Sequence, residues 1–237
     1  MPATTPDVAT RLGAAAPLVL PSVLACDFAN LQREVEAAEQ AGAQALHLDV
    51  MDGHFVPNLS FGLPLVEAIR GVTSLPLDVH LMINNPAEYV ERYREAGADV
   101  ITFHAEVEPE PAELLEKIRS LGAAAGLSLN PPMAVTEIEA ALPYCDLVLV
   151  MSVMPGFGGQ AFNPVAIEKL RWLREHPRCD ALLEVDGGVN ADTIADCTAA
   201  GADLLVAGTA FFGADDYRSR MTELASLAAK GAATPRD

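Results

Sequence analysis

The chain is poor in basic residues and in cysteine, and each shortage excludes a class of function. Its 237 residues include only 15 Lys and Arg against 33 Asp and Glu, which gives a net charge of −18. No basic patch is long enough to follow a nucleic-acid backbone, so we expect no nucleic-acid partner. The four cysteines, Cys26, Cys145, Cys179 and Cys197, form no CxxC pair. We therefore expect reduced thiols in a cytoplasmic protein.

Uninterrupted apolar stretches that could cross a bilayer are also missing. The longest stretch without charge, residues 147–167, is broken by two prolines and three glycines, so we expect no membrane segment. Residues 1–16 lack both an apolar signal core and the Arg- and Ser-rich composition of a transit peptide. They are predicted to form a disordered N-terminal tail, and residues 230–237 a C-terminal tail.

Between the tails, short apolar runs alternate with helical patterns. The runs are predicted to be buried parallel strands, at residues 18–25, 44–50, 77–83, 100–105, 125–129, 147–153, 181–185 and 204–207. Each is followed by a predicted helix, at residues 28–40, 63–69, 86–96, 111–121, 135–142, 164–175, 191–200 and 217–229. Three helices end in the same phrase, Ala-Gly-Ala, at residues 41–43, 96–98 and 200–202, which indicates a repeated unit with a glycine stop signal.

Eight such units are the number that closes a single (β/α)8 TIM barrel, here over residues 17–229. The alternative is a doubly wound open sheet. That fold places a glycine-rich loop after its first strand, whereas residues 24–27 read LACD. The sequence therefore favours the barrel as the catalytic domain.

Polar side chains gather at the predicted strand ends, where active sites lie in barrels of this kind. They are Ser22, His47, Asp49, Asp78, His80, His104, Glu106, Asn130, Ser152, Glu184, Asp186 and Thr209. His47 and Asp49 share one face of a strand, because alternate side chains point the same way. With His80 and Asp186 they predict a site for one divalent metal ion: Zn, Fe(II), Mn or Co. His104 has no partner at metal-ligand spacing, so we expect it either to support a ligand from behind or to belong to the core.

Three glycine-rich segments follow neighbouring strands: PGFGGQ at 155–160, DGG at 186–188 and AGT at 207–209. Glycine lets backbone N–H groups approach an anion closely, and barrels often bind phosphate after strands seven and eight. We therefore expect a phosphorylated ligand; tight turns without a ligand are the alternative. Met51, Met82 and Met151 also lie near strand ends, as an apolar cover that excludes water or as ordinary core filling.

Long motifs make the chain resemble the ribulose-phosphate 3-epimerase family from about residue 18 to about residue 229. The motifs are LPS at 20–22, HLDVMDGHFVPN at 47–58, DVHLM at 78–82, SVMPGFGGQ at 152–160, EVDGG at 184–188 and GT at 208–209. The resemblance implies a metal-dependent epimerase, an isomerase of carbohydrate metabolism. Its reaction would interconvert D-ribulose 5-phosphate and D-xylulose 5-phosphate at C3 through an ene-diolate, as in the pentose phosphate pathway and the Calvin cycle.

The resemblance also implies roles for single residues. His47, Asp49, His80 and Asp186 match the metal ligands. Asp49 matches the proton acceptor and Asp186 the proton donor. Substrate contacts are implied for Ser22, His80, Gly156, Phe157, Gly158, Gly159, Asp186, Gly187, Gly188, Gly208 and Thr209.

Three positions depart from the family pattern. Met154 stands where Asn or Glu is usual, Thr209 where Ser is usual, and Pro132 where Gly is usual. Thr209 keeps a hydroxyl and an N–H group, so phosphate binding is expected to persist. Met154 and Pro132 bear instead on loop shape and on the choice of substrate.

The chemistry of the residues agrees with the resemblance. Epimerisation beside a carbonyl removes a proton from one face and returns one to the other, which two carboxylates can do if one is ionised and one protonated. Alternatives are an epimerase of a six-carbon ketose phosphate such as D-allulose 6-phosphate, a lyase on a related phosphate-binding barrel, and a non-catalytic sugar-phosphate sensor. The expected partner is a phosphorylated ketopentose, and a homo-oligomer is expected.

Overall fold

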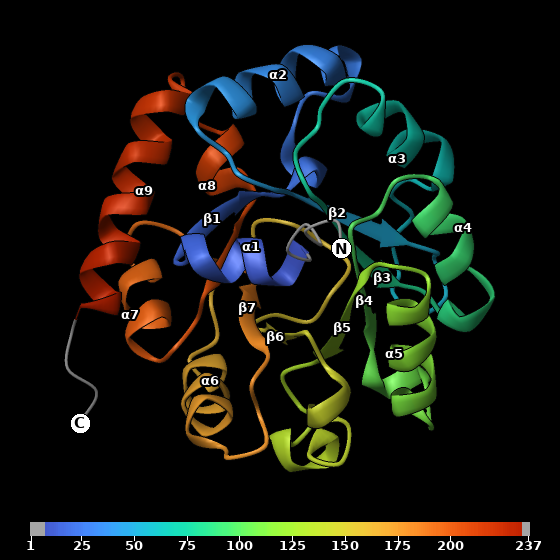
Figure 1. Cartoon of the computed structure of the whole chain (residues 1–237). Helices are drawn as coiled ribbons and strands as arrows, with labels where there is room; N and C mark the ends of the chain where they lie inside the picture. The colour runs from blue at the N-terminus through green and yellow to red at the C-terminus, as the bar shows by residue number, and fades with distance from the viewer. Residues whose placement is uncertain (1–7, 234–237) are drawn as a thin grey trace, which may run out of the picture.

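A computed structural model describes residues 8–233, so the tail residues 1–7 and 234–237 lie outside the described part. Parallel strands form a ring surrounded by helices (Figure 1). The strands are β1 (Leu18–Pro21), β2 (Leu46–Met51), β3 (Leu77–Met82), β4 (Val100–His104), β5 (Ala124–Leu129), β6 (Leu147–Met151), β7 (Leu182–Asp186) and β8 (Leu204–Ala207). They pair in the order β1-β8-β7-β6-β5-β4-β3-β2, and a parallel bridge between Ser22 and His47 connects the two ends. The predicted (β/α)8 barrel is confirmed.

Helices of the outer ring follow the strands along the chain. They are α2 (Leu31–Ala41), α3 (Leu63–Arg70), α4 (Val90–Glu95), α5 (Pro111–Ser120), α6 (Val165–Glu175), α7 (Ile194–Ala199), α8 (Thr209–Phe212) and α9 (Tyr217–Ala232). The glycines of the three Ala-Gly-Ala phrases all adopt positive φ, from 105° to 112°. This is the left-handed conformation that ends a helix and turns the chain toward the next strand.

Two segments differ from the sequence prediction. The expected helix at 135–142 is a pair of 3-10 turns, Val135–Ile138 and Leu142–Tyr144. Pro143 lies within the second turn, and a proline both lacks an N–H group and disfavours the α conformation of the preceding residue. The expected first strand ends early, at Pro21, and continues as the 3-10 turn Val23–Ala25.

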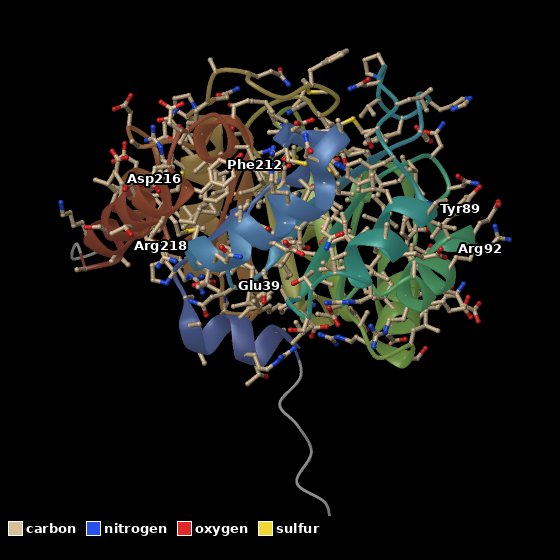
Figure 2. All side chains as sticks on the ribbon, turned by 90° about the horizontal axis from the view of Figure 1, so that it is seen from above. Glu39, Tyr89, Arg92, Phe212, Asp216 and Arg218 are labelled. Atoms are coloured by element: carbon tan, nitrogen blue, oxygen red, sulfur yellow. The ribbon has the colours of Figure 1, made fainter. Side chains whose placement is uncertain are left out.

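The last helix packs beside the first helix of the outer ring. The Tyr217 hydroxyl donates a hydrogen bond of 2.5 Å to Glu34 of α2. Arg218, labelled in Figure 2, donates one of 2.7 Å to the carbonyl of Gln40. α9 continues to Ala232, and Gly231 is buried, so its last turn occupies residues that were expected to start the C-terminal tail.

A further helix, α1 (Val8–Ala15), lies across the N-terminal end of the barrel (Figures 1 and 2). Val8 and Leu12 are buried there. They belong to a cluster with the inward-facing side chains of the strands, among them Leu18, Leu147 and Leu204. The structure thus differs from the expected disordered tail over residues 8–15, because two apolar side chains four residues apart cover an open apolar end of the barrel.

The two faces of the strands differ in chemistry. Outward-facing residues, such as Val79, Leu81 and Val150, pack under the helices in the main apolar core. Inward-facing residues are apolar near α1 and become polar toward the carboxyl ends, where the side chains of His47 and His80 are fully buried. Among the described residues, no helix combines the length and apolar character needed to span a bilayer.

We expect α1 to contribute to stability. Leu12 is only 3% exposed, so Leu12→Ala should lower the free energy of unfolding by about 2–5 kcal/mol, the usual cost of a buried Leu→Ala change. Urea denaturation followed by circular dichroism measures this difference. Arg11→Ala, at an exposed position of the same helix, is the matched control and should change stability by less than about 0.5 kcal/mol. Equal, small effects of both variants would contradict a packed α1.

Candidate active site

A cavity of about 490 Å³ opens at the carboxyl ends of the strands. The residues predicted from the sequence to contact a substrate line it, with one exception: Ser22, Gly156, Phe157, Gly158, Gly159, Asp186, Gly187, Gly188, Gly208 and Thr209. The exception is His80, which is fully buried beneath the cavity. Asp49 and the three methionines Met51, Met82 and Met151 complete much of the remaining wall.

The four predicted metal ligands converge below this cavity. One ligand atom from each of His47, Asp49, His80 and Asp186 can be chosen so that all lie within 4.8 Å of one another. Oδ1 of Asp49 is at the centre, 3.3 Å from Nε2 of His47 and 3.3 Å from Nδ1 of His80. The other carboxylate oxygen of Asp49 accepts a 2.6 Å hydrogen bond from the hydroxyl of Ser22. β2, β3 and β7 therefore supply one compact group of donors, and Ser22, directly after β1, supports it.

His47 is oriented by a second carboxylate. Its Nδ1 lies 2.6 Å from Oδ2 of Asp78, and both side chains are fully buried. When the ring is neutral and its Nδ1 proton is donated to Asp78, the Nε2 atom has a lone pair, and in the described residues this Nε2 has no hydrogen-bond partner. A buried nitrogen with a free lone pair beside a carboxylate is the arrangement expected of a metal ligand, so the donors present fit a divalent transition metal.

The two central carboxylates have shifted pKa values of opposite direction. Burial disfavours ionisation of Asp49, but the imidazoles of His47 and His80 outweigh it and lower the pKa of Asp49. Burial and the negative charge of Asp49 raise the pKa of Asp186 to about 7. Near neutral pH, Asp49 is thus ionised while Asp186 can hold a proton, which is the division of roles that two-sided proton transfer requires.

The histidines are also tuned by their surroundings. Burial lowers the pKa of His80 to about 4, against the opposing effect of Asp49. For His47, burial has the same direction, but Asp49 and Asp78 outweigh it and raise the pKa well above its ordinary value. His80 is therefore neutral, as a metal ligand must be, whereas metal binding at His47 would have to displace a proton.

Three polar residues of the strands that were assigned no ligand role lie against this group. Asp78 accepts a hydrogen bond from Nδ1 of His47, and Oε1 of Glu184 lies 3.5 Å from the same nitrogen. Burial and the charge of Asp78 raise the pKa of Glu184 well above its ordinary value. His104 lies with its Nε2 only 2.8 Å from Nε2 of His80. One signal could have found Asp78, since it precedes His80 by two residues and so shares the inner face of β3.

The glycine-rich loop after β6 is held to its neighbours by specific contacts. Asn58 donates a 2.7 Å hydrogen bond to the carbonyl of Gly156. Gln160 donates to the carbonyls of Met154 and Phe157 within the loop, at 2.7 and 2.9 Å. None of the residues that line the cavity is Lys or Arg, so an anion there would be bound by backbone N–H groups.

Comparison with known proteins now identifies the family. Residues 18–212 match the ribulose-phosphate 3 epimerase family. The chain is 48% identical over 211 residues to ribulose-phosphate 3-epimerase of Mycobacterium tuberculosis, which covers 88% of this chain and 91% of that protein. The chain belongs to the ribulose-phosphate 3-epimerase family. With the enzyme of the same name from Bacillus subtilis it shares 46% identity over 210 residues, or 87% of this chain and 97% of the other.

This family membership confirms the resemblance seen in the motifs and makes the protein an enzyme of the isomerase class. Solved structures agree on the fold alone. Tryptophan synthase of Mycobacterium tuberculosis superposes with a TM-score of 0.69 at 15% identity, covering 94% of this chain and 99% of that one. A mutant tryptophan synthase α-subunit of Pyrococcus furiosus gives 0.68 at 15% identity, covering 90% and 98%.

Gly188 is expected to be the least replaceable glycine of the cavity wall. Its φ is +64°, and a methyl group there would lie 2.5 Å from the backbone nitrogen of Phe162. Gly188→Ala should therefore displace the segment before α6 and lower the melting temperature. Gly62→Ala is the control, because its nearest neighbour would be the Tyr93 hydroxyl at 3.9 Å. Thermal unfolding compares the two; equal melting temperatures would contradict the close packing at Gly188.

Proposed function

We propose that the protein interconverts D-ribulose 5-phosphate and D-xylulose 5-phosphate by moving protons at C3. The observation that carries this proposal is one cavity with two contrasting ends. Asp49 and Asp186 lie at its base beside two histidines, and glycine-rich loops form its wall. A phosphorylated ketose has matching ends, with a carbonyl and neighbouring hydroxyl at one and a phosphate at the other.

Two carboxylates on opposite strands would perform the proton transfers. Asp49, ionised and on β2, removes the C3 proton from one face and leaves an ene-diolate. Asp186, protonated and on β7, delivers a proton to the opposite face. The opposite pKa shifts of the two groups support this assignment. In the reverse reaction the two residues exchange roles, as microscopic reversibility requires.

A divalent metal ion, Zn, Fe(II), Mn or Co, is proposed as the cofactor. His47, Asp49, His80 and Asp186 would hold it, because their donor atoms converge and because two imidazoles with two carboxylates suit these metals. When bound, the metal would polarise the substrate oxygens and stabilise the negative charge that develops on them. Ser22 keeps the Asp49 carboxylate in place through its hydroxyl.

The phosphate is proposed to bind at the backbone N–H groups of Gly158, Gly159, Gly188, Gly208 and Thr209. These five residues all line the cavity, and backbone donors bind an anion without a cationic side chain. Phe157 and the cavity methionines would help to exclude water from the reacting carbons. The carboxylates of Asp49 and Asp186 then stay free for the reacting part of the sugar.

Location and assembly are proposed on separate grounds. All four cysteines are free thiols, which supports a reducing, cytoplasmic location. A homo-oligomer is also proposed, because Leu59 is 73% exposed and Phe28 is 47% exposed. Large apolar side chains on the surface would be covered in such an assembly.

The nearest alternative is an epimerase of a six-carbon ketose phosphate, which the same base and wall could serve. We expect metal-loaded protein to turn over D-ribulose 5-phosphate with a higher kcat/KM than D-allulose 6-phosphate. Coupled assays of both sugars decide the substrate.

The proposed metal is tested by removing it. Chelation should abolish both activities, and Zn, Fe(II), Mn or Co should restore them. Full activity in a sample shown by metal analysis to be metal-free would reject the metal proposal.

Isotope tracing tests the two-acid assignment without mutating a metal ligand. If Asp49 removes one proton and Asp186 delivers another, the product formed in D2O should carry deuterium at C3 from the first turnover. A single base would return the original hydrogen part of the time. Mass spectrometry of the product of single-turnover reactions measures the difference. Substantial transfer of a C3 label from substrate to product would overturn the assignment.

A further inference from the structure

His104 is a buried histidine for which the proposed reaction has no task. It ends β4, on the inner face of the barrel, and its side chain is fully buried. Its Nε2 lies 2.8 Å from Nε2 of His80. The ring of Phe55 covers it, with centroids 4.6 Å apart. Two imidazole nitrogens at this distance share a single hydrogen, so one ring donates and the other accepts.

The direction of this hydrogen bond follows from the place of His80. Its Nδ1 faces Oδ1 of Asp49 at 3.3 Å, among the converging donor atoms. A nitrogen that binds a metal offers its lone pair and carries no hydrogen. With a metal bound at Nδ1, the hydrogen of His80 must be on Nε2, where it is donated to His104. The acceptor, Nε2 of His104, has no hydrogen, and the hydrogen of His104 is on Nδ1.

The far end of His104 faces a carboxylate. Its Nδ1 lies 3.3 Å from Oε2 of Glu106, a contact just outside hydrogen-bond geometry, and Nδ1 has no other partner among the described residues. The second oxygen of Glu106 accepts a 2.7 Å hydrogen bond from the backbone N–H of Asn130. Lys169 donates to the carbonyl of the same Asn130 at 2.7 Å. The carboxylate is therefore anchored to the end of β5 and favours a hydrogen on Nδ1 of His104.

From this geometry we infer that His104 and Glu106 are positioning residues for the metal site. The chain of contacts His80–His104–Glu106 selects the form of His80 that has its hydrogen on Nε2 and its lone pair on Nδ1. It also fixes the angle of the ring. This inference rests on the proposed metal site and extends it by two residues that do not touch the metal.

The two metal-binding histidines are thereby held in different ways. His47 gives its Nδ1 hydrogen to Asp78 and presents Nε2. His80 gives its Nε2 hydrogen to another imidazole and presents Nδ1. The two histidines also lie at different levels of the barrel, since the register partner of His80 is Asp49 and that of His47 is Asp78. A partner that holds the second nitrogen of a metal-bound histidine typically contributes 10- to 100-fold in metal affinity.

The test compares three substitutions in the full-length protein. His104→Leu removes the acceptor, whereas His104→Gln keeps an amide oxygen that can accept from His80. Ser128→Ala is the matched control, since Ser128 pairs with His104 in the adjacent strand and is equally buried. The dissociation constant for Zn²⁺ is measured by competition with a chromophoric chelator, and thermal unfolding of the metal-free proteins reports folding.

We expect His104→Leu to weaken Zn²⁺ binding by about 10- to 100-fold, and His104→Gln to recover most of that loss. Ser128→Ala should bind Zn²⁺ as the unsubstituted protein does. The absorption spectrum of bound Co²⁺ should change for His104→Leu and not for Ser128→Ala. Unchanged affinity in folded His104→Leu, or a glutamine variant as weak as the leucine variant, would overturn the inference.

A measurement on the unsubstituted protein keeps the inference testable if His104→Leu does not fold. Nitrogen-15 spectra of the Zn²⁺-loaded protein show which nitrogen of His104 carries its hydrogen. A hydrogen on Nδ1 leaves Nε2 free to accept from His80 and supports the inference, whereas a hydrogen on Nε2 overturns it. The two proposals can also fail separately. If the unsubstituted protein binds no metal, the proposed cofactor is wrong, whereas normal metal binding that is insensitive to position 104 rejects only the role of His104.

Discussion

One bridge between Ser22 and His47 joins β1 to β2 and so connects the two ends of the eight-stranded sheet. The active-site geometry depends on this closure. It brings the Ser22 hydroxyl to the Asp49 carboxylate, and it sets β7 across the barrel from β2, so that Asp186 faces the same centre. In an open sheet, the first and seventh strands would lie far from the second, and the four donors could not form one group. The fold is in this sense the first requirement of the chemistry.

Closure also creates an interior in which polar groups are costly. Five ionisable side chains on the inner face, His47, Asp78, His80, His104 and Glu184, are fully buried, where apolar side chains would cost less free energy. Their cost is limited by mutual contacts and, for Glu184, by a raised pKa, which favours the uncharged form. The compensating apolar packing lies elsewhere, under the helices of the outer ring and against α1 at the opposite end. Stability and chemistry therefore depend largely on different parts of the barrel.

Much of the fold and of the metal-ligand group could be predicted from the sequence. The alternation of side chains along each strand and the order of strands and helices can both be read from it, and they predict the barrel and the convergence of the metal-ligand candidates. The link between His80 and His104 could not be predicted, because it depends on a 2.8 Å distance between rings on adjacent strands. The contact of Asp78 with His47 was not predicted either, although the position of Asp78 two residues before His80 places it on the inner face of β3. The helix α1 was not predicted, because Val8 and Leu12 are only two apolar positions in a segment rich in Ala and Thr. A helix this short is stable only when it packs against the rest of the protein.

The proposed phosphate site uses peptide N–H groups, and peptide groups are not encoded by residue type. Most substitutions in these loops would change what surrounds the donors without deleting them. The chain already carries two departures there, Met154 and Thr209. In evolution, such a site can keep its affinity for the anion while the loop sequence drifts and the selectivity for the rest of the sugar changes. Substitutions that abolish phosphate binding would be confined to the few glycines that need a positive φ or a close approach, such as Gly188.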